Sequence, residues 1–150
     1  MLSEAKLFDA ETERYVVDRA LIDQVALPLG DRYDDELFSG YFADYAGMAR
    51  KFKPKRIFEI GVRYGYTGIV FMLGLRANRG QPKAEYLGID DESYHLNSCA
   101  QANANFVQAL PGYEMRAINY NSFNGPLAGI GTFDLIHVDA HHSAHAVTND

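Results

Sequence analysis

The sequence predicts an α/β fold, and three observations support this prediction. Four short apolar segments, expected to be strands, alternate with helical segments between residues 56 and 138. Such alternation is typical of a parallel sheet with right-handed crossovers. A turn with several glycines follows the first strand, and no internal repeat is visible. We therefore expect a parallel α/β sheet in residues 53–150, behind an N-terminal helical cap in residues 1–52.

Composition is that of an ordinary globular chain with one domain. Of its 150 residues, 47% are hydrophobic and 23% are charged, which is enough to build a core. No apolar run approaches the ~20 residues of a membrane span, and the N-terminus lacks a signal-peptide pattern. We expect a cytoplasmic protein without a membrane partner. The single cysteine, Cys99, cannot form an internal disulfide.

Charge is distributed unevenly along the chain. The net charge is −6, and residues 1–50 carry eleven acidic and five basic side chains. The acidity therefore belongs to the predicted cap. Neither half offers the basic face that nucleic-acid binding usually needs, so no nucleic-acid partner is expected.

Two helices are expected before the first strand. Asp9 is a suitable N-cap for a helix that runs to about Leu27, before Pro28. The second begins at the acidic residues 34–36 and ends at Lys53-Pro54. Its apolar residues recur at helical spacing, as expected of one buried face: Leu37, Tyr41, Tyr45, Met48 and Phe52.

The later elements follow from apolar periodicity and from the breaks between them. Residues 66–78 have almost no polar face, which predicts a buried helix. Residues 94–110 place Leu96, Cys99, Asn103, Phe106 and Leu110 on one face, which predicts another. The expected strands are residues 56–62, 85–90, 113–120 and 132–138. The last of these is apolar enough that both its faces and both its edges should be covered.

The turn at residues 59–68, here called the cradle, has the features of a ligand site. Gly61 and Gly65 let the backbone turn sharply and approach a ligand closely, and the helix start behind them has unpaired N–H groups. The pyrophosphate fingerprint G-x-G-x-x-G is not met, because Arg63 and a tyrosine occupy its second and third glycine positions. The carboxylate of Glu59, expected to face the cradle, would repel phosphate and attract a cationic or amino-bearing ligand. A nicotinamide dehydrogenase is therefore the less favoured hypothesis.

An acid follows the second strand where nucleotide-binding folds keep one for the ribose hydroxyls. This residue is Asp90, followed by Asp91. A carboxylate accepts hydrogen bonds from two vicinal hydroxyls, so the chemistry suits the position. A helix N-cap cluster is the alternative interpretation.

The cradle resembles motif I of the class I S-adenosylmethionine-dependent methyltransferases, whose acid-x-Gly-x-Gly-x-Gly loop faces the methionine part of the cofactor. Arg63 replaces the middle glycine. Residues 138–150 are similar to the small-molecule, O-methyltransferase-like branch, whose fourth strand ends in V-D-G-[acid or amide]-H-S-Y, with a further aspartate eight residues after the histidine. The matching residues are Asp139, His142, Ser143 and Asp150, whereas Ala140, His141 and Ala144 depart from the pattern.

This resemblance implies S-adenosylmethionine as cofactor and a small-molecule acceptor methylated on oxygen or nitrogen. The cofactor-binding candidates are Glu59, Gly61, Tyr64, Gly65, Thr67, Asp90, Asn121 and Ser122. Asn121 and Ser122 would contact the adenine, although a plain turn is an alternative there.

His142 is the candidate general base, because an imidazole titrates near neutral pH. Asp139 is the second catalytic candidate, and it would orient that imidazole, line the cofactor pocket or bind a divalent metal. A metal cluster of Asp139, His141 and His145 and a plain polar loop remain alternatives, and His95 and His137 are taken as structural.

The family resemblance also implies a Rossmann-like, doubly wound parallel sheet. Only its first four strands are present in residues 53–150, and the family has three more strands beyond the fourth. We therefore expect either a homo-oligomer that pairs along the fourth strand or a sequence truncated after that strand. A non-catalytic module for cofactor binding or assembly is the alternative to an enzyme.

Overall fold

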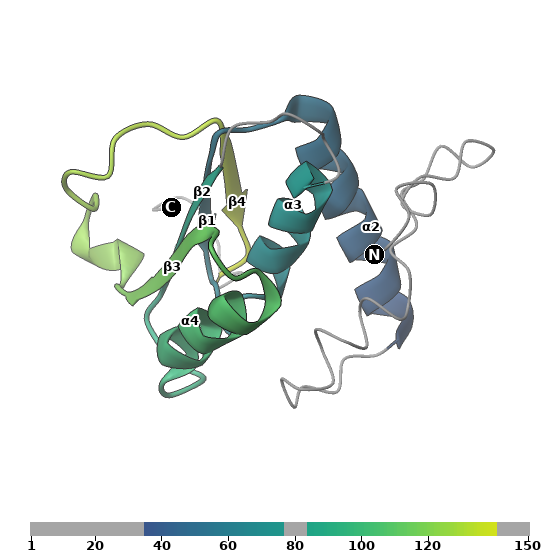
Figure 1. Cartoon of the computed structure of the whole chain (residues 1–150). Coiled ribbons are helices and arrows are strands. Elements are labelled where there is room, and N and C mark those ends of the chain that lie inside the picture. Colours follow the sequence, from purple (N-terminus) through teal and green to yellow (C-terminus); the bar gives the residue numbers. More distant parts are fainter. Residues whose placement is uncertain (1–34, 77–83, 141–150) are drawn as a thin grey trace. The chain divides into compact units, whose positions relative to one another are not determined.

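The computed structural model describes residues 35–76 and 84–140. The chain forms two compact units. One unit comprises residues 1–53 and 69–81, and the other comprises residues 54–68 and 82–150. The helix expected at Asp9–Leu27 lies outside the described residues. The elements, labelled in Figure 1, are α2 (Asp35–Phe52), β1 (Arg56–Ile60), α3 (Tyr66–Arg76), β2 (Glu85–Asp90), α4 (Ser98–Ala109), β3 (Glu114–Asn119), the 3-10 helix η3 (Ser122–Asn124) and β4 (Leu135–Val138).

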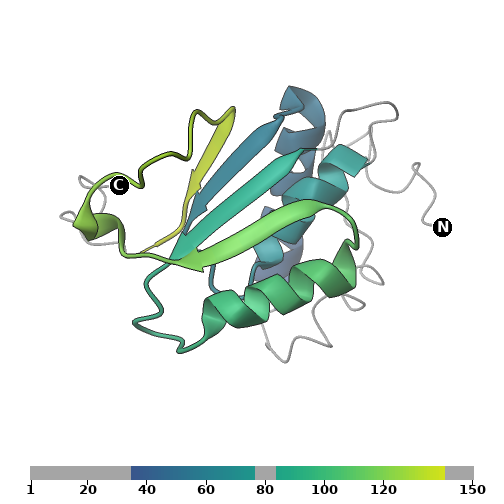
Figure 2. The ribbon, with the colours of Figure 1, turned by 60° about the vertical axis from the view of Figure 1, so that its left-hand side comes forward.

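The four strands form one parallel sheet in the order β3-β2-β1-β4 (Figure 2). The chain adds β2 and β3 on one side of β1 and then returns to place β4 on the other side. This reversal is the switch point of a doubly wound sheet, and ligands bind there outside the carboxyl ends of the strands. The predicted Rossmann-like parallel sheet is confirmed.

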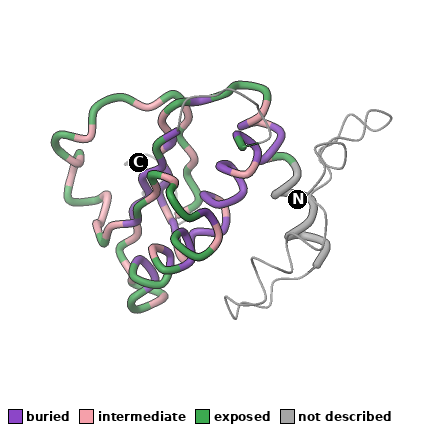
Figure 3. The backbone as a smooth tube through the Cα atoms, viewed as in Figure 1, coloured by how far each residue is buried: buried purple, intermediate pink, exposed green. Residues whose placement is uncertain are grey.

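The core of the second unit lies on the central strands and on one side of α4, as the buried segments in Figure 3 show. β2 has a neighbouring strand on each side, which explains why its middle residues are all buried. The rings of Tyr86 on β2 and Phe106 on α4 meet edge to face, with centroids 5.4 Å apart. The amide of Asn103 also bonds both the N–H and the carbonyl of Ala117, each at 2.8 Å. α4 is thereby anchored to β2 and β3.

In the first unit, α2 packs closely against the part of α3 that belongs to it. The rings of Tyr45 and Phe71 lie 5.3 Å apart. A Cβ on Gly74 would lie 2.3 Å from the carbonyl oxygen of Ala46, so the glycine permits this approach. Within residues 35–76 and 84–140, no helix combines the length and the apolar character needed to cross a bilayer.

α4 begins four residues later than the sequence predicts, at Ser98 instead of Tyr94. Glu92 and Asn97 have φ values of +58° and +62°, a left-handed conformation that a right-handed helix cannot include. The segment before α4 is therefore a loop. The expectation that Leu96 is buried is wrong, because this side chain is 83% exposed.

β4 is shorter than predicted. The N–H of Asp134 still donates to the Arg56 carbonyl at 2.9 Å, but the segment before it is held mainly by side chains. The Arg56 guanidinium donates to the carbonyl oxygens of Ile130 and Thr132 at 2.8 and 2.7 Å, and its carbon lies 4.7 Å from the Phe133 ring centroid. Asp134 accepts hydrogen bonds from two backbone N–H groups at the start of β1.

The described residues do not supply the cover expected for β4. Within the described part of the chain, β4 pairs with β1 alone. Ile136 and Val138 are 58% and 47% exposed, so one face of this strand is partly open.

Asp134 makes stability depend on pH. Hydrogen bonds from the backbone N–H groups of Lys55 and Arg56 hold the pKa of Asp134 below its usual value. Because the pKa is lower in the folded state, the ionised Asp134 stabilises the fold at pH values above its unfolded pKa of about 4. This contribution is lost as the pH falls through the folded pKa. We expect Asp134→Asn to lower the free energy of unfolding in urea at pH 7 and to cost much less at pH 3. The exposed Asp44→Asn is the control, and an equal cost at both pH values would contradict this account.

Candidate functional site

The candidate site residues that the structure describes lie at the carboxyl ends of the four strands. The cradle follows β1, Asp90 ends β2, Asn121 follows β3 and Asp139 follows β4. Parallel strands bring these ends to one edge of the sheet. The hydrogen bonds described below connect the first three of these positions, and a close backbone approach connects the fourth.

Both glycines of the cradle are required by its geometry. Gly61 has φ +91°, and a Cβ there would lie 2.1 Å from the carbonyl oxygen of Asp139. Gly65 has φ +83°, and a Cβ there would lie 2.3 Å from the Phe106 ring. The N–H of Asp139 donates to the Ile60 carbonyl at 2.9 Å. The end of β4 therefore lies directly against the cradle.

Arg63 occupies the position of the middle glycine of motif I and keeps a conformation that suits glycine. Its φ is +48°, a region that costs a non-glycine residue about 1–2 kcal/mol. Its guanidinium carbon lies 5.4 Å from the Tyr64 ring centroid. The backbone of the motif is retained although the glycine is not.

Asp90 ties the cradle to the loops after β2 and β3. One carboxylate oxygen accepts from the backbone N–H of Arg63 and the other from that of Glu92, each at 2.8 Å. The Asp90 carbonyl accepts from the N–H of Tyr120 at 2.9 Å. Each carboxylate oxygen has a second lone pair for a ligand hydroxyl. The alternative, a helix N-cap cluster, applies to its neighbour Glu92, which accepts from the N–H of Cys99 in the first turn of α4 at 3.0 Å. Asp90 itself does not cap α4, whose N-cap position is Asn97.

Asn121 serves a local turn and also faces the loop after β2. Its side-chain oxygen accepts from the N–H of Phe123 at 2.9 Å and caps η3. Its side-chain nitrogen lies 3.3 Å from a carboxylate oxygen of Asp91. Ser122 is the first residue of η3 and is half-buried. Asn121 therefore serves a turn. The loop that contains Asn121 and Ser122 is linked to Asp91 by the Asn121 side chain.

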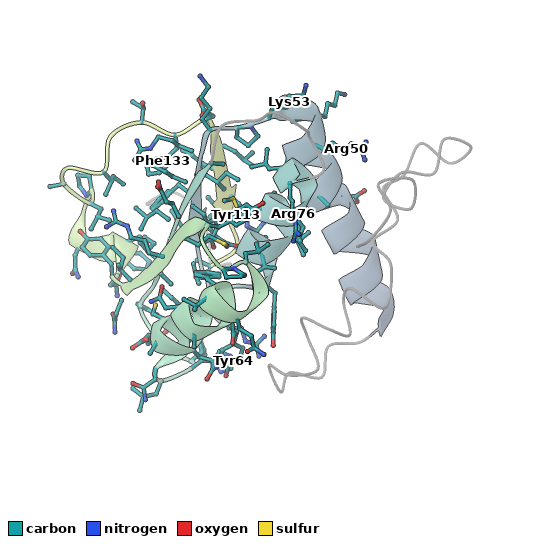
Figure 4. The ribbon with its side chains drawn as sticks, viewed as in Figure 1. Arg50, Lys53, Tyr64, Arg76, Tyr113 and Phe133 are labelled. Carbon is teal, nitrogen blue, oxygen red and sulfur yellow. The ribbon has the colours of Figure 1, made fainter. Side chains whose placement is uncertain are left out.

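Tyr64, labelled in Figure 4, is held by two residues that the sequence did not single out for the site. Its hydroxyl lies 3.5 Å from Nδ1 of His95, and its carbonyl accepts from the side chain of Asn105 at 2.9 Å. Asn105 is 1% exposed and also accepts from Gln101. The sequence signal that could have identified it is an amide next to the apolar residues of α4, a pattern that Asn103 shares. Thr67 is half-buried in the first turn of α3.

The orientation expected for Glu59 is wrong. Its side chain is 1% exposed and turns into the interior, not toward an open cradle. The Tyr86 hydroxyl donates to one carboxylate oxygen, and Nδ1 of His137 lies 2.9 Å from the other. His137, which the sequence analysis took as structural, is the partner of this acid.

The pKa values of Glu59, His137 and Tyr86 are all shifted from their usual ranges. Burial raises the pKa of Glu59 above its usual range, although the hydrogen bond and the charge of His137 oppose the shift. Burial lowers the pKa of His137, but the hydrogen bond and charge of Glu59 outweigh this effect and leave the pKa raised. Burial also raises the pKa of Tyr86, which keeps its hydroxyl a donor.

The candidate catalytic residues are only partly described. Asp139 is exposed, directly after β4. His142, Ser143 and Asp150 lie outside the described residues, as do His141 and His145. Among the residues that are described, no cluster of histidine, cysteine or carboxylate side chains has the geometry of a metal site.

Comparison with known families supports the motifs found in the sequence. A family model described as a methyltransferase domain matches residues 58–150. The chain belongs to this methyltransferase family. The matched range begins within β1 and includes the cradle, Asp90 and the segment after β4. No curated protein is significantly similar to the chain.

Solved structures share the fold. The methyltransferase PaMTH1 of Podospora anserina, bound to S-adenosylhomocysteine, is 26% identical with a TM-score of 0.68, over 93% of this chain and 58% of that one. An O-methyltransferase of Bacillus cereus with S-adenosylhomocysteine is 14% identical with a TM-score of 0.60, over 83% and 56%. TomG of Streptomyces achromogenes with S-adenosylmethionine is 18% identical with a TM-score of 0.57, over 93% and 63%. The chain thus spans 56–63% of the length of these structures.

Proposed function

We propose that the protein is an S-adenosylmethionine-dependent methyltransferase that acts on an oxygen or nitrogen of a small molecule. The observation that carries this proposal is the hydrogen bond between the Arg63 N–H and the carboxylate of Asp90. It joins the glycine turn of motif I to the acid that suits ribose hydroxyls, at the switch point of the sheet. The S-adenosylhomocysteine bound to PaMTH1, which shares 26% identity, supports the same ligand here.

The cradle residues fit this ligand better than a dinucleotide. Gly61 and Gly65 allow the cradle to pack against Asp139 and Phe106, and Arg63 occupies the position where a pyrophosphate needs a glycine. In this proposal the cradle, with Tyr64 and Thr67, holds the methionine part. Asp90 accepts hydrogen bonds from the ribose hydroxyls, and Asn121 and Ser122 line the adenine side.

His142 is the proposed general base. The cofactor supplies a methyl group on a sulfonium, and the protein contributes alignment of the acceptor and removal of its proton. His142 would take that proton, and Asp139, beside Gly61, would orient the imidazole or line the pocket. A divalent metal is not included in the proposal, and the cytoplasmic location remains a prediction.

Calorimetry tests the proposal most simply. We expect S-adenosylmethionine and S-adenosylhomocysteine to bind the folded chain with one-to-one stoichiometry, whereas NADH should not bind. No heat of binding from either ligand, with a circular dichroism spectrum of a folded α/β protein, would contradict the proposal. Binding of NADH alone would favour the dehydrogenase hypothesis.

A non-catalytic cofactor-binding module is the second candidate function. Ligand binding without turnover on a panel of hydroxyl and amine acceptors would favour this candidate over the enzyme.

We also propose that the edge of β4 left unpaired by the described strands pairs with another polypeptide segment. The exposure of Ile136 and Val138 supports this proposal, since an exposed apolar edge strand invites association. If a second copy of the chain is the partner, sedimentation should give a dimer or larger oligomer that Ile136→Lys weakens. A monomer at all concentrations would contradict the homo-oligomer.

A further inference from the structure

The carboxylate of Glu59 joins three strands beneath the cradle. Glu59 on β1 and His137 on β4 are direct neighbours in the strand register, and Tyr86 reaches the same carboxylate from β2. Among the described residues, Glu59 is the only charged side chain in the buried class. Two residues farther along the chain is Gly61, where the cradle turns.

Whether a buried carboxylate is ionised depends on the hydrogen-bond donors around it. Removing an ionised carboxylate from water is costly unless hydrogen bonds compensate, and otherwise the group takes up a proton. Here each oxygen of Glu59 has one partner, the hydroxyl of Tyr86 or Nδ1 of His137. The other titratable groups that act on this cluster are Asp139 and Cys99, and the charge of Asp139 disfavours the ionised Glu59. The two donors are therefore what opposes protonation.

We propose that His137 is a positioning residue that keeps Glu59 ionised beneath the cradle, so that the site favours a positively charged cofactor relative to its neutral product. This inference rests on the proposed function. S-adenosylmethionine carries a sulfonium charge that S-adenosylhomocysteine lacks, and the two molecules otherwise differ by one methyl group. When His137 is neutral and donates through Nδ1, the Glu59–His137 pair carries one negative charge, which acts on the cation and not on the thioether. Protonation of His137 would cancel this charge, so the two dissociation constants are compared at a pH above the raised pKa of His137. Compared with a neutral site of the same shape, such a site would have a higher affinity for S-adenosylmethionine relative to S-adenosylhomocysteine.

The test is the ratio of the two dissociation constants, measured by calorimetry on the full chain. His137→Leu removes the donor, and Glu59→Gln removes the charge itself. Both variants should lower the preference for S-adenosylmethionine over S-adenosylhomocysteine by about tenfold relative to wild type. His137→Asn is the matched control, because its amide nitrogen takes the place of Nδ1, and its ratio should stay close to that of wild type. The double variant should show the same ratio as Glu59→Gln alone.

The ratio separates this role from a structural one. If His137 only stabilises the sheet, His137→Leu weakens both ligands equally and leaves the ratio unchanged, which would overturn the inference. If His137→Leu does not fold, Tyr86→Phe removes the other donor without adding a cavity and should shift the ratio in the same direction, whereas an unchanged ratio there would overturn it. Failure of both ligands to bind folded wild type would instead overturn the proposed function, and this inference with it.

Discussion

Gly65→Ala is expected to destabilise the protein by about 2–5 kcal/mol. Two costs add at this position. Gly65 has φ +83°, which a residue with a Cβ adopts at a cost of about 1–2 kcal/mol. The new Cβ would also lie 2.3 Å from the Phe106 ring and 3.2 Å from the Ala102 Cβ, and overpacking of a core typically costs about 1–3 kcal/mol.

Gly112→Ala separates these two costs. Gly112 also has φ +83°, but no atom lies within 4 Å of the position its Cβ would take. This variant should lose about 1–2 kcal/mol, the backbone cost alone. Urea unfolding of both variants measures the difference, and Phe106→Leu in the Gly65→Ala background should recover part of the overpacking cost. Equal losses for Gly65→Ala and Gly112→Ala would show that the cradle does not press against α4.

His142→Ala should lower kcat by about 10²- to 10⁴-fold, the usual contribution of a general base. The acceptor must lose a proton as it takes the methyl group, and an imidazole near the cofactor is suited to that step. The assay is formation of S-adenosylhomocysteine with an acceptor on which the wild type turns over. The affinity for S-adenosylhomocysteine should change little, since the base acts on the acceptor.

His145→Ala provides a nearby histidine control for this assay. We expect it to retain turnover, because His145 falls outside the family pattern that His142 matches. Unchanged turnover in His142→Ala would refute the assignment of the base. A comparable loss in both variants would point to a shared role, such as a metal cluster.

Local sequence patterns predicted the strands well, because apolar segments and the glycines that separate them can be recognised without knowledge of the tertiary structure. β2 begins and ends where the sequence predicts, at Glu85 and Asp90. α4 was misjudged at its start, because Asn97 takes a left-handed φ of +62° that apolar periodicity cannot reveal. β4 was predicted too long, because Arg56, distant in sequence, holds the segment before it.

The site could be predicted where its geometry is local and not where it depends on the packing of strands. The glycine spacing identified the cradle, and the end of β2 identified Asp90. The orientation of Glu59 depends on which face of β1 is covered, and its contact with His137 depends on the pairing of β1 with β4. These pairings join residues about eighty positions apart, and no local pattern encodes them.

The central claim is that the ends of these strands form an S-adenosylmethionine site. Amide NMR of the 15N-labelled chain during titration with S-adenosylhomocysteine tests it directly. We predict saturable shifts of the Gly61, Gly65 and Asp90 amides, with Gly112 and Gly131 unchanged. Saturable shifts confined to other segments, or no shift at the cradle of a folded chain, would contradict the claim.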